Sequence, residues 1–125
     1  MITEEASPLV VDLAKSFISL IRGIAPDWST GYLRFCSQAF VAESKASYVH
    51  QSGVEIIDVL KYKDFFQAIS VKGQELLATL GKPEGLFLLI VDSNFDYEIK
   101  FEYSNLDKWR ITKMRGGTGI PTELE

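Results

Sequence analysis

The chain has 125 residues with four prolines and a single cysteine; hydrophobic residues make up 46% of it, and its formal net charge is −4. This length and composition indicate one globular domain with a hydrophobic core and exclude an intrinsically disordered chain. The negative charge argues against direct nucleic-acid binding, because neutralising phosphates requires a basic surface, and it favours a basic partner.

The first predicted element is an amphipathic helix from about Thr3 to Ile24, since apolar residues recur there at helical spacing. Thr3 or Ser7 could supply the N-cap, and Ala25-Pro26 should end the helix. The opening residues MITEEASP are acidic where a signal peptide would be basic, and no apolar stretch approaches the roughly twenty residues of a membrane span. We therefore expect a cytoplasmic protein without a membrane partner.

A β-hairpin is predicted next, with strands at Tyr32 to Ala42 and Ala46 to His50 separated by a polar Glu43-Ser44-Lys45 turn. The segment from Val54 to Leu60 is either a third strand or an extended lead-in. Cys36 lies in an apolar segment and cannot form an internal disulfide, so we expect a buried thiol in a reducing compartment rather than a catalytic nucleophile.

A second helix follows from the spacing of apolar residues between positions 62 and 80, with Gly81 as a C-cap and Pro83 just beyond it. Gly73 inside this helix is expected to cost about 1 kcal/mol relative to alanine. The apolar stripe consists of Tyr62, Phe65, Phe66, Ile69, Leu76, Leu77 and Leu80.

The stretch GLFLLIVDSNFDYEIKFEY, from Gly85 to Tyr103, is the most distinctive pattern in the chain. An apolar run, a polar break and a strict alternation predict a β-hairpin with one buried and one solvent-exposed face. Its second arm should direct Phe95, Tyr97, Ile99, Phe101 and Tyr103 to one side and Asp96, Glu98, Lys100 and Glu102 to the other.

Together these elements predict an α+β fold: an antiparallel sheet of about five strands with two main helices packed on one face. The whole chain, 1–125, is expected to form a single domain. After Asn105 basic residues crowd around two apolar ones, and we expect a loop or a flexible, basic and glycine-rich tail from about residue 112. The residues concerned are Lys108, Arg110, Lys113 and Arg115 around Trp109 and Ile111.

No pattern in the sequence points to catalysis or to a metal or cofactor. His50 is the only histidine, and the spacing offers it no partner, so a surface histidine at a strand end is favoured over a catalytic one. The glycine run at 114–119 has no following helix to hold a phosphate. Carboxylate pairs on an exposed strand lack the burial that would shift their pKa toward neutral pH. We therefore expect a protein that is not an enzyme and uses no cofactor.

The acidic side of the final hairpin is the candidate working surface. Charged residues on the exposed face of a sheet are common and also discourage aggregation, which is the simpler interpretation. The concentration of acids in one short segment favours an interface for a basic partner, with Tyr97, Tyr103 or Trp109 as aromatic anchors, although the two tyrosines fit the core better. The candidate partner-binding residues are Asp92, Asp96, Glu98, Glu102, Asp107 and Trp109.

The order of elements and the final hairpin resemble the YezG-like immunity proteins, which are bacterial antitoxins. The shared features are a helix ending before Asp27-Trp28, an aromatic strand pair at 32–50, a helix with Phe65-Phe66, and the segment LFLLIVDSNFDYEIKFEYSNLDKW. The resemblance extends to about Trp109, and the short basic, glycine-rich end departs from it. It implies a non-enzymatic protein of a contact-dependent growth inhibition system that blocks the active site or substrate access of a cognate toxin domain, commonly a basic nuclease.

Two other classes of function stay open. One is a small-molecule-binding or enzymatic α+β domain, with a pocket between helices and sheet lined by Phe35, Phe40, Tyr48, Phe87 and Phe101, although these aromatics are more simply core residues. The other is a structural adaptor in a larger assembly.

Overall fold

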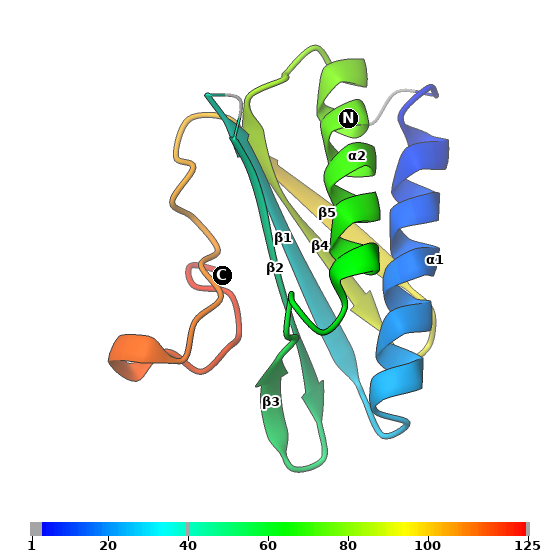
Figure 1. The fold of residues 1–125 in the computed structure, drawn as a ribbon, viewed down its shortest axis with the longest axis vertical. Coiled ribbons are helices and arrows are strands. Elements are labelled where there is room, and N and C mark those ends of the chain that lie inside the picture. The colour runs from blue at the N-terminus through cyan, green and yellow to red at the C-terminus, as the bar shows by residue number, and fades with distance from the viewer. Residues whose placement is uncertain (1–3, 40, 125) are drawn as a thin grey trace.

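The computed structural model describes residues 4–39 and 41–124 and contains a five-stranded antiparallel sheet with two helices on one face (Figure 1). The strand order is β3-β2-β1-β4-β5, so β1 is central and β5 forms one edge. The predicted α+β fold is confirmed. The helices are α1 (Ser7–Ile24) and α2 (Lys63–Thr79), and the strands are β1 (Thr30–Gln38), β2 (Val41–His50), β3 (Gly53–Ile56), β4 (Gly85–Asp92) and β5 (Tyr97–Glu102).

Helix α1 begins later than the sequence predicted. Its N-cap is Ala6, which has no capping side chain, and Ser7 is already helical, while Thr3 lies outside the described residues. Pro8 occupies the first turn, where its missing N–H costs nothing. The predicted end is confirmed at Ala25, whose extended backbone and N–H bond to the Ile21 carbonyl close the helix.

The predicted turn at Glu43-Ser44-Lys45 is wrong. Strand β1 pairs with β2 from Thr30↔Val49 to Gln38↔Val41, so the chain reverses direction between Gln38 and Val41. Ala39 adopts a left-handed conformation with φ 51°, and Phe40 lies outside the described residues. These polar residues instead lie within the first half of β2, which does not pair with β3. Exposure alternates along this half of the strand, so Glu43 and Lys45 face solvent.

Strand β3 is shorter than the predicted segment from Val54 to Leu60. It pairs only with the end of β2, from Ser47↔Ile56 to His50↔Gly53. The chain then leaves the sheet after Ile57, whose N–H still donates to the Ala46 carbonyl. Hydrogen bonds from the backbone N–H groups of Leu60 and Lys61 to Asp58 form a turn before α2.

Helix α2 ends in the predicted glycine motif, with Gly81 at φ 73°. Gly73 has a packing role that the sequence did not show. A β-carbon at Gly73 would lie 2.8 Å from the Phe35 ring, so glycine is what allows the helix to approach the sheet this closely. Glycine at position 73 lowers the helix propensity of α2, but it allows α2 to pack closely against β1.

The main core lies between the two helices and the sheet (Figure 1). Phe35 and Phe87 are fully buried at its centre, with ring centroids 5.2 Å apart. The remaining large, fully buried side chains of this core are Leu13, Phe17, Ile21, Leu33, Ile69, Leu76, Leu77 and Leu89.

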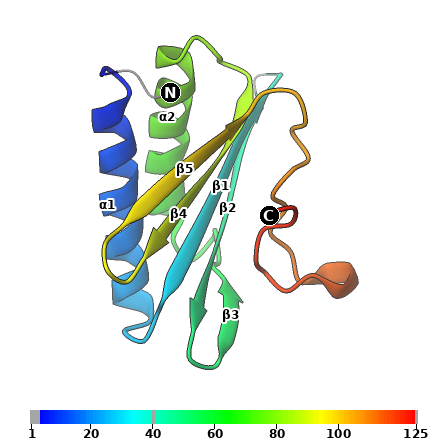
Figure 2. The same ribbon diagram turned by 180° about the vertical axis from the view of Figure 1, so that it is seen from behind.

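A second, smaller core covers the opposite face of the sheet. The segment after β5 folds back along this face, which Figure 2 shows from behind. Trp109 and Ile111 of this segment pack with sheet residues of β1 and β4, namely Tyr32, Cys36, Leu86 and Leu88. Strand β4 is therefore buried on both faces, and the prediction that one face of the hairpin is exposed to solvent holds only for part of β5.

Backbone and side-chain hydrogen bonds hold this C-terminal segment in place. The Ser47 hydroxyl donates to the Gly119 carbonyl at 2.6 Å, and the Thr122 N–H donates to the Arg110 carbonyl at 3.0 Å. The segment has the irregular backbone that was predicted, with one short 3-10 turn at Met114–Gly116. Flexibility from about residue 112 stays a prediction, but the packing gives the segment a defined place on the sheet.

Candidate functional site

The acidic residues of the predicted partner-binding surface fall into two groups, the first of which shapes local structure. Asp92 Oδ1 accepts hydrogen bonds from the N–H groups of Asn94 at 2.8 Å and Asp96 at 3.2 Å, and thereby forms the β4–β5 turn. Glu102 accepts from the N–H groups of Ser104 and Asn105 and pairs with Lys108 at 3.2 Å. These contacts, led by the Asn105 N–H, lower the pKa of Glu102 from 4.5 to about 2.

The two predicted residues beyond β5 also have local partners. Asp107 forms an ion pair with Arg110 three residues later. Trp109 is only 5% exposed and belongs to the second core, so its indole is not available at the surface as an anchor. The sequence predicted an aromatic residue near the acids but could not show that the chain turns back after β5 and buries it.

The second group remains exposed at the edge of the sheet. Asp96 and Glu98 are exposed, Asp96 has no ion pair within the described residues, and Glu98 lies 3.8 Å from Lys100. Three aromatic side chains also stand out along this edge: Phe95 is 57%, Tyr97 47% and Tyr103 40% exposed. The prediction that these aromatic residues face away from solvent therefore fails in part. We call this set, Asp96, Glu98, Phe95, Tyr97 and Tyr103, the β5 edge surface.

Packing explains why these aromatic residues are only half covered. Tyr97 and Phe95 line a shallow groove with the side of α1, and the Arg22 guanidinium lies over the Phe95 ring, 5.3 Å from its centroid. Ile99 and Phe101, further along β5, do pack against the main core. The helix layer thus covers the middle of β5 and leaves its start exposed. Because β5 pairs only with β4, its other edge also keeps open backbone hydrogen-bonding groups.

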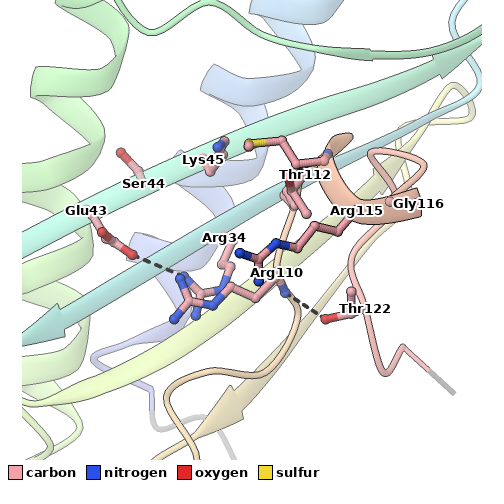
Figure 3. Close-up of a pocket in the computed structure, with 12 residues that line it drawn as sticks. Arg34, Glu43, Ser44, Lys45, Arg110, Thr112, Arg115, Gly116 and Thr122 are labelled. Carbon is pink, nitrogen blue, oxygen red and sulfur yellow. Dashed lines mark hydrogen bonds and ion pairs between the residues drawn. The ribbon is translucent and has the colours of Figure 1, made fainter.

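A larger pocket lies between the C-terminal segment and the outer face of β1 and β2 (Figure 3). Its volume is about 720 Å³, within the range of pockets that hold small molecules. Four cationic residues line it, together with one carboxylate, Glu43. The cations are Arg34, Lys45, Arg110 and Arg115.

Arg34 forms the floor of this pocket and anchors the C-terminal segment. It is 4% exposed; its Nε donates to the Lys108 carbonyl at 2.8 Å and its Nη2 to the Leu106 carbonyl at 2.6 Å. Its Nη1 lies 3.5 Å from Glu43 Oε1. Burial lowers the pKa of Arg34, and nearby Arg110 lowers it further. Cys36, on the same face, is a buried free thiol as predicted, and burial raises its pKa.

His50 has partners that the sequence reasoning missed. Its Nε2 lies 3.4 Å from Glu55 Oε2, its Nδ1 lies 3.7 Å from Asp27 Oδ2, and its Nδ1 accepts a hydrogen bond from the Ser52 N–H. The bond from the Ser52 N–H to Nδ1 leaves Nε2 as the ring nitrogen that can donate to Glu55. Together with the bond from the Gln51 N–H to Asp27, this network holds the β2–β3 turn against the loop after α1. Glu55 is five residues from His50 in the sequence and lies across the β2–β3 hairpin from it. A prediction that these two strands pair could have identified it as a partner.

The aromatic residues proposed for a pocket between helices and sheet belong instead to the packed core. Phe35 and Phe87 are fully buried against each other and Phe101 packs against Phe87, while Tyr48 is buried elsewhere in the same core and Phe40 lies outside the described residues. Over residues 4–39 and 41–124, no group of three or more histidine, cysteine or carboxylate side chains is arranged to hold a metal ion. Neither α1 nor α2 combines the length and apolar character needed to cross a membrane.

Comparison with protein-family models gives no match to this sequence, and comparison with curated proteins gives none either. The resemblance to YezG-like immunity proteins therefore remains a prediction from the sequence pattern. The proposed function therefore rests on the fold and on the β5 edge surface.

Proposed function

We propose that this protein is an immunity protein that binds a cognate toxin domain, a basic nuclease, and blocks its active site or its access to substrate. The observation that supports this most is the β5 edge surface, where exposed acids and exposed aromatics alternate along one edge of the sheet. Aromatic residues supply most of the binding energy in protein interfaces, and acids select and steer a basic partner. A nuclease has to be basic to hold nucleic acid, so its charge complements the acidic edge.

Two further features support a binding role over a catalytic one. Asp96 and Glu98 are exposed to solvent. The carboxylate with the largest shift, Glu102, has its pKa lowered by local hydrogen bonds, away from the value a general acid needs near neutral pH. The open edge of β5 also offers backbone groups that a strand of the partner could pair with. We place the site of action in the cytoplasm, where the buried Cys36 thiol would remain reduced.

The test is a growth assay in bacteria with the toxin-like domain encoded beside this chain. That domain is expressed alone and together with this protein, and the complex is isolated through a tag on this protein. The proposal expects growth arrest by the domain alone, rescue on co-expression, and a stable complex. Growth arrest that co-expression does not relieve, with no complex recovered, would contradict it.

A small-molecule-binding function remains as a second candidate, and the pocket on the other face of the sheet favours it. The aromatic residues first considered for such a pocket are core residues. The cationic pocket beneath the C-terminal segment has the volume and the polar groups that such a function requires.

A further inference from the structure

The cationic pocket stands out against the charge of the whole chain. The protein has a formal net charge of −4, but the pocket gathers four cations and one carboxylate. Like charges brought together on one surface repel each other, and Arg110 adds to the lowering of the Arg34 pKa that burial causes. An anion bound among them would relieve it.

Two of the four cations already bind other groups of the protein. Arg34 donates to two carbonyls of the C-terminal segment and faces Glu43, and Arg110 pairs with Asp107. The other two, Lys45 and Arg115, are exposed, and within the described residues neither forms an ion pair. They reach the pocket from opposite walls, Lys45 from β2 and Arg115 from the C-terminal segment (Figure 3).

The backbone around Arg115 presents its side chain to the pocket. Arg115 adopts a left-handed conformation, φ 53° and ψ 41°, which is uncommon for a residue with a side chain. The following Gly117 lies so close to the Thr112 carbonyl that a β-carbon there would be 2.2 Å from the oxygen. This close approach folds residues 112–117 into a tight loop, and in Figure 3 the guanidinium groups of Arg34, Arg110 and Arg115 point toward the same region.

We propose that this pocket binds a small organic phosphate between Lys45 and Arg115. Guanidinium groups pair with phosphate through two parallel hydrogen bonds, and a lysine adds a point charge. The walls also include apolar surface from Ile111 and from Met114, which is 74% exposed. Apolar contact is what an organic group attached to the phosphate would use, and the volume of about 720 Å³ has room for a nucleotide-sized molecule.

This inference names the ligand class for the pocket that supports the second candidate function, and it does not depend on the immunity function. The pocket lies over β1 and β2, which β4 separates from the β5 edge surface. A protein that neutralises a toxin through β5 could bind a phosphate ligand here at the same time. Failure of the immunity proposal would leave this one standing, and failure of this one would leave the immunity proposal standing.

Isothermal titration calorimetry of the full chain tests the proposal with ADP, pyrophosphate, inorganic phosphate, citrate and a short single-stranded oligonucleotide as probes. We expect ADP to bind in the micromolar to millimolar range and more tightly than pyrophosphate or phosphate. Lys45→Gln and Arg115→Gln should each weaken ADP binding by about tenfold, as the loss of a charged hydrogen bond does. Lys63→Gln, the same change at an exposed residue of α2, is the matched control and should bind like the wild type.

Because Lys45 and Arg115 are exposed, their variants are expected to fold, and circular dichroism verifies this. Absence of ADP binding at about 10 mM, or ADP binding unchanged in the double variant, would overturn the proposal. Citrate binding as tightly as ADP would overturn the choice of phosphate, and pyrophosphate binding as tightly would overturn the organic part. Binding of the oligonucleotide without ADP would assign the pocket to nucleic acid instead.

Discussion

Replacing Trp109 by alanine tests whether the C-terminal segment is part of the folded domain. The indole is 5% exposed and packs against Tyr32, Leu86, Leu88 and Ile111. Truncating a buried tryptophan to alanine costs about 3–5 kcal/mol through lost burial and the cavity that remains. Because a domain of this size is stable by only about 5–15 kcal/mol, Trp109→Ala should remove a large part of that stability.

The assay is urea unfolding followed by far-UV circular dichroism, which does not depend on the fluorescence of the removed indole. Met114→Ala is the matched control in the same segment, since Met114 is 74% exposed and its truncation should change the free energy of unfolding by less than about 0.5 kcal/mol. A free energy of unfolding for Trp109→Ala within about 0.5 kcal/mol of the wild type would refute the second core and favour a tail detached from the sheet.

Three further predictions follow from single contacts. Gly73→Ala should destabilise the protein by about 1–3 kcal/mol because the new methyl group meets the Phe35 ring. Gly23→Ala, the control with open space around it, should instead stabilise α1 by up to about 1 kcal/mol. Equal changes in the free energy of unfolding for the two variants in urea would refute the packing role of Gly73. Arg34→Met should cost about 2–3 kcal/mol in the same assay, since two part-buried carbonyls lose their charged donor. An unchanged stability would contradict the role of Arg34 as an anchor. The folded-state pKa of Glu102 is lowered from 4.5 to about 2, so the stabilising contribution of Glu102 is complete above pH 4.5 and is lost as the pH falls toward 2. The difference in free energy of unfolding between wild type and Glu102→Gln should therefore close over that pH range. A difference that does not change with pH would contradict this.

The elements that could be predicted from the sequence are those whose signal is local. The alternation after Gly85 and the helical spacing before Ile24 identified β5 and α1, because periodicity reports directly which side chains share a face. The turn at Glu43-Ser44-Lys45 was misplaced because polar residues mark turns and exposed strand positions alike. The first half of β2 does not pair with β3, and this feature of the assembled sheet is what distinguishes an exposed strand position from a turn here.

The candidate site was harder to predict because it depends on contacts between distant parts of the chain. Arg34 meets the carbonyls of Leu106 and Lys108 more than seventy positions later, and no periodicity signals such a contact. The same fold-back buries Trp109 and turns a run of basic residues into one wall of a pocket. The acids of β5 were found from their pattern, but which of them remain available depends on turns and ion pairs that only the structure shows.

The most direct test of the proposed function is the rate constant for association with the toxin domain, measured by stopped-flow fluorescence for wild type and for the double variant Asp96→Lys, Glu98→Lys. Asp64→Lys, Glu75→Lys, two exposed acids on α2, makes the same change in net charge away from the β5 edge surface and serves as the control. We predict that the β5 variant associates at least about tenfold more slowly at low salt and that the difference shrinks as salt rises, while the control stays close to the wild type. Association of the β5 variant at the rate of the control would contradict docking through this edge.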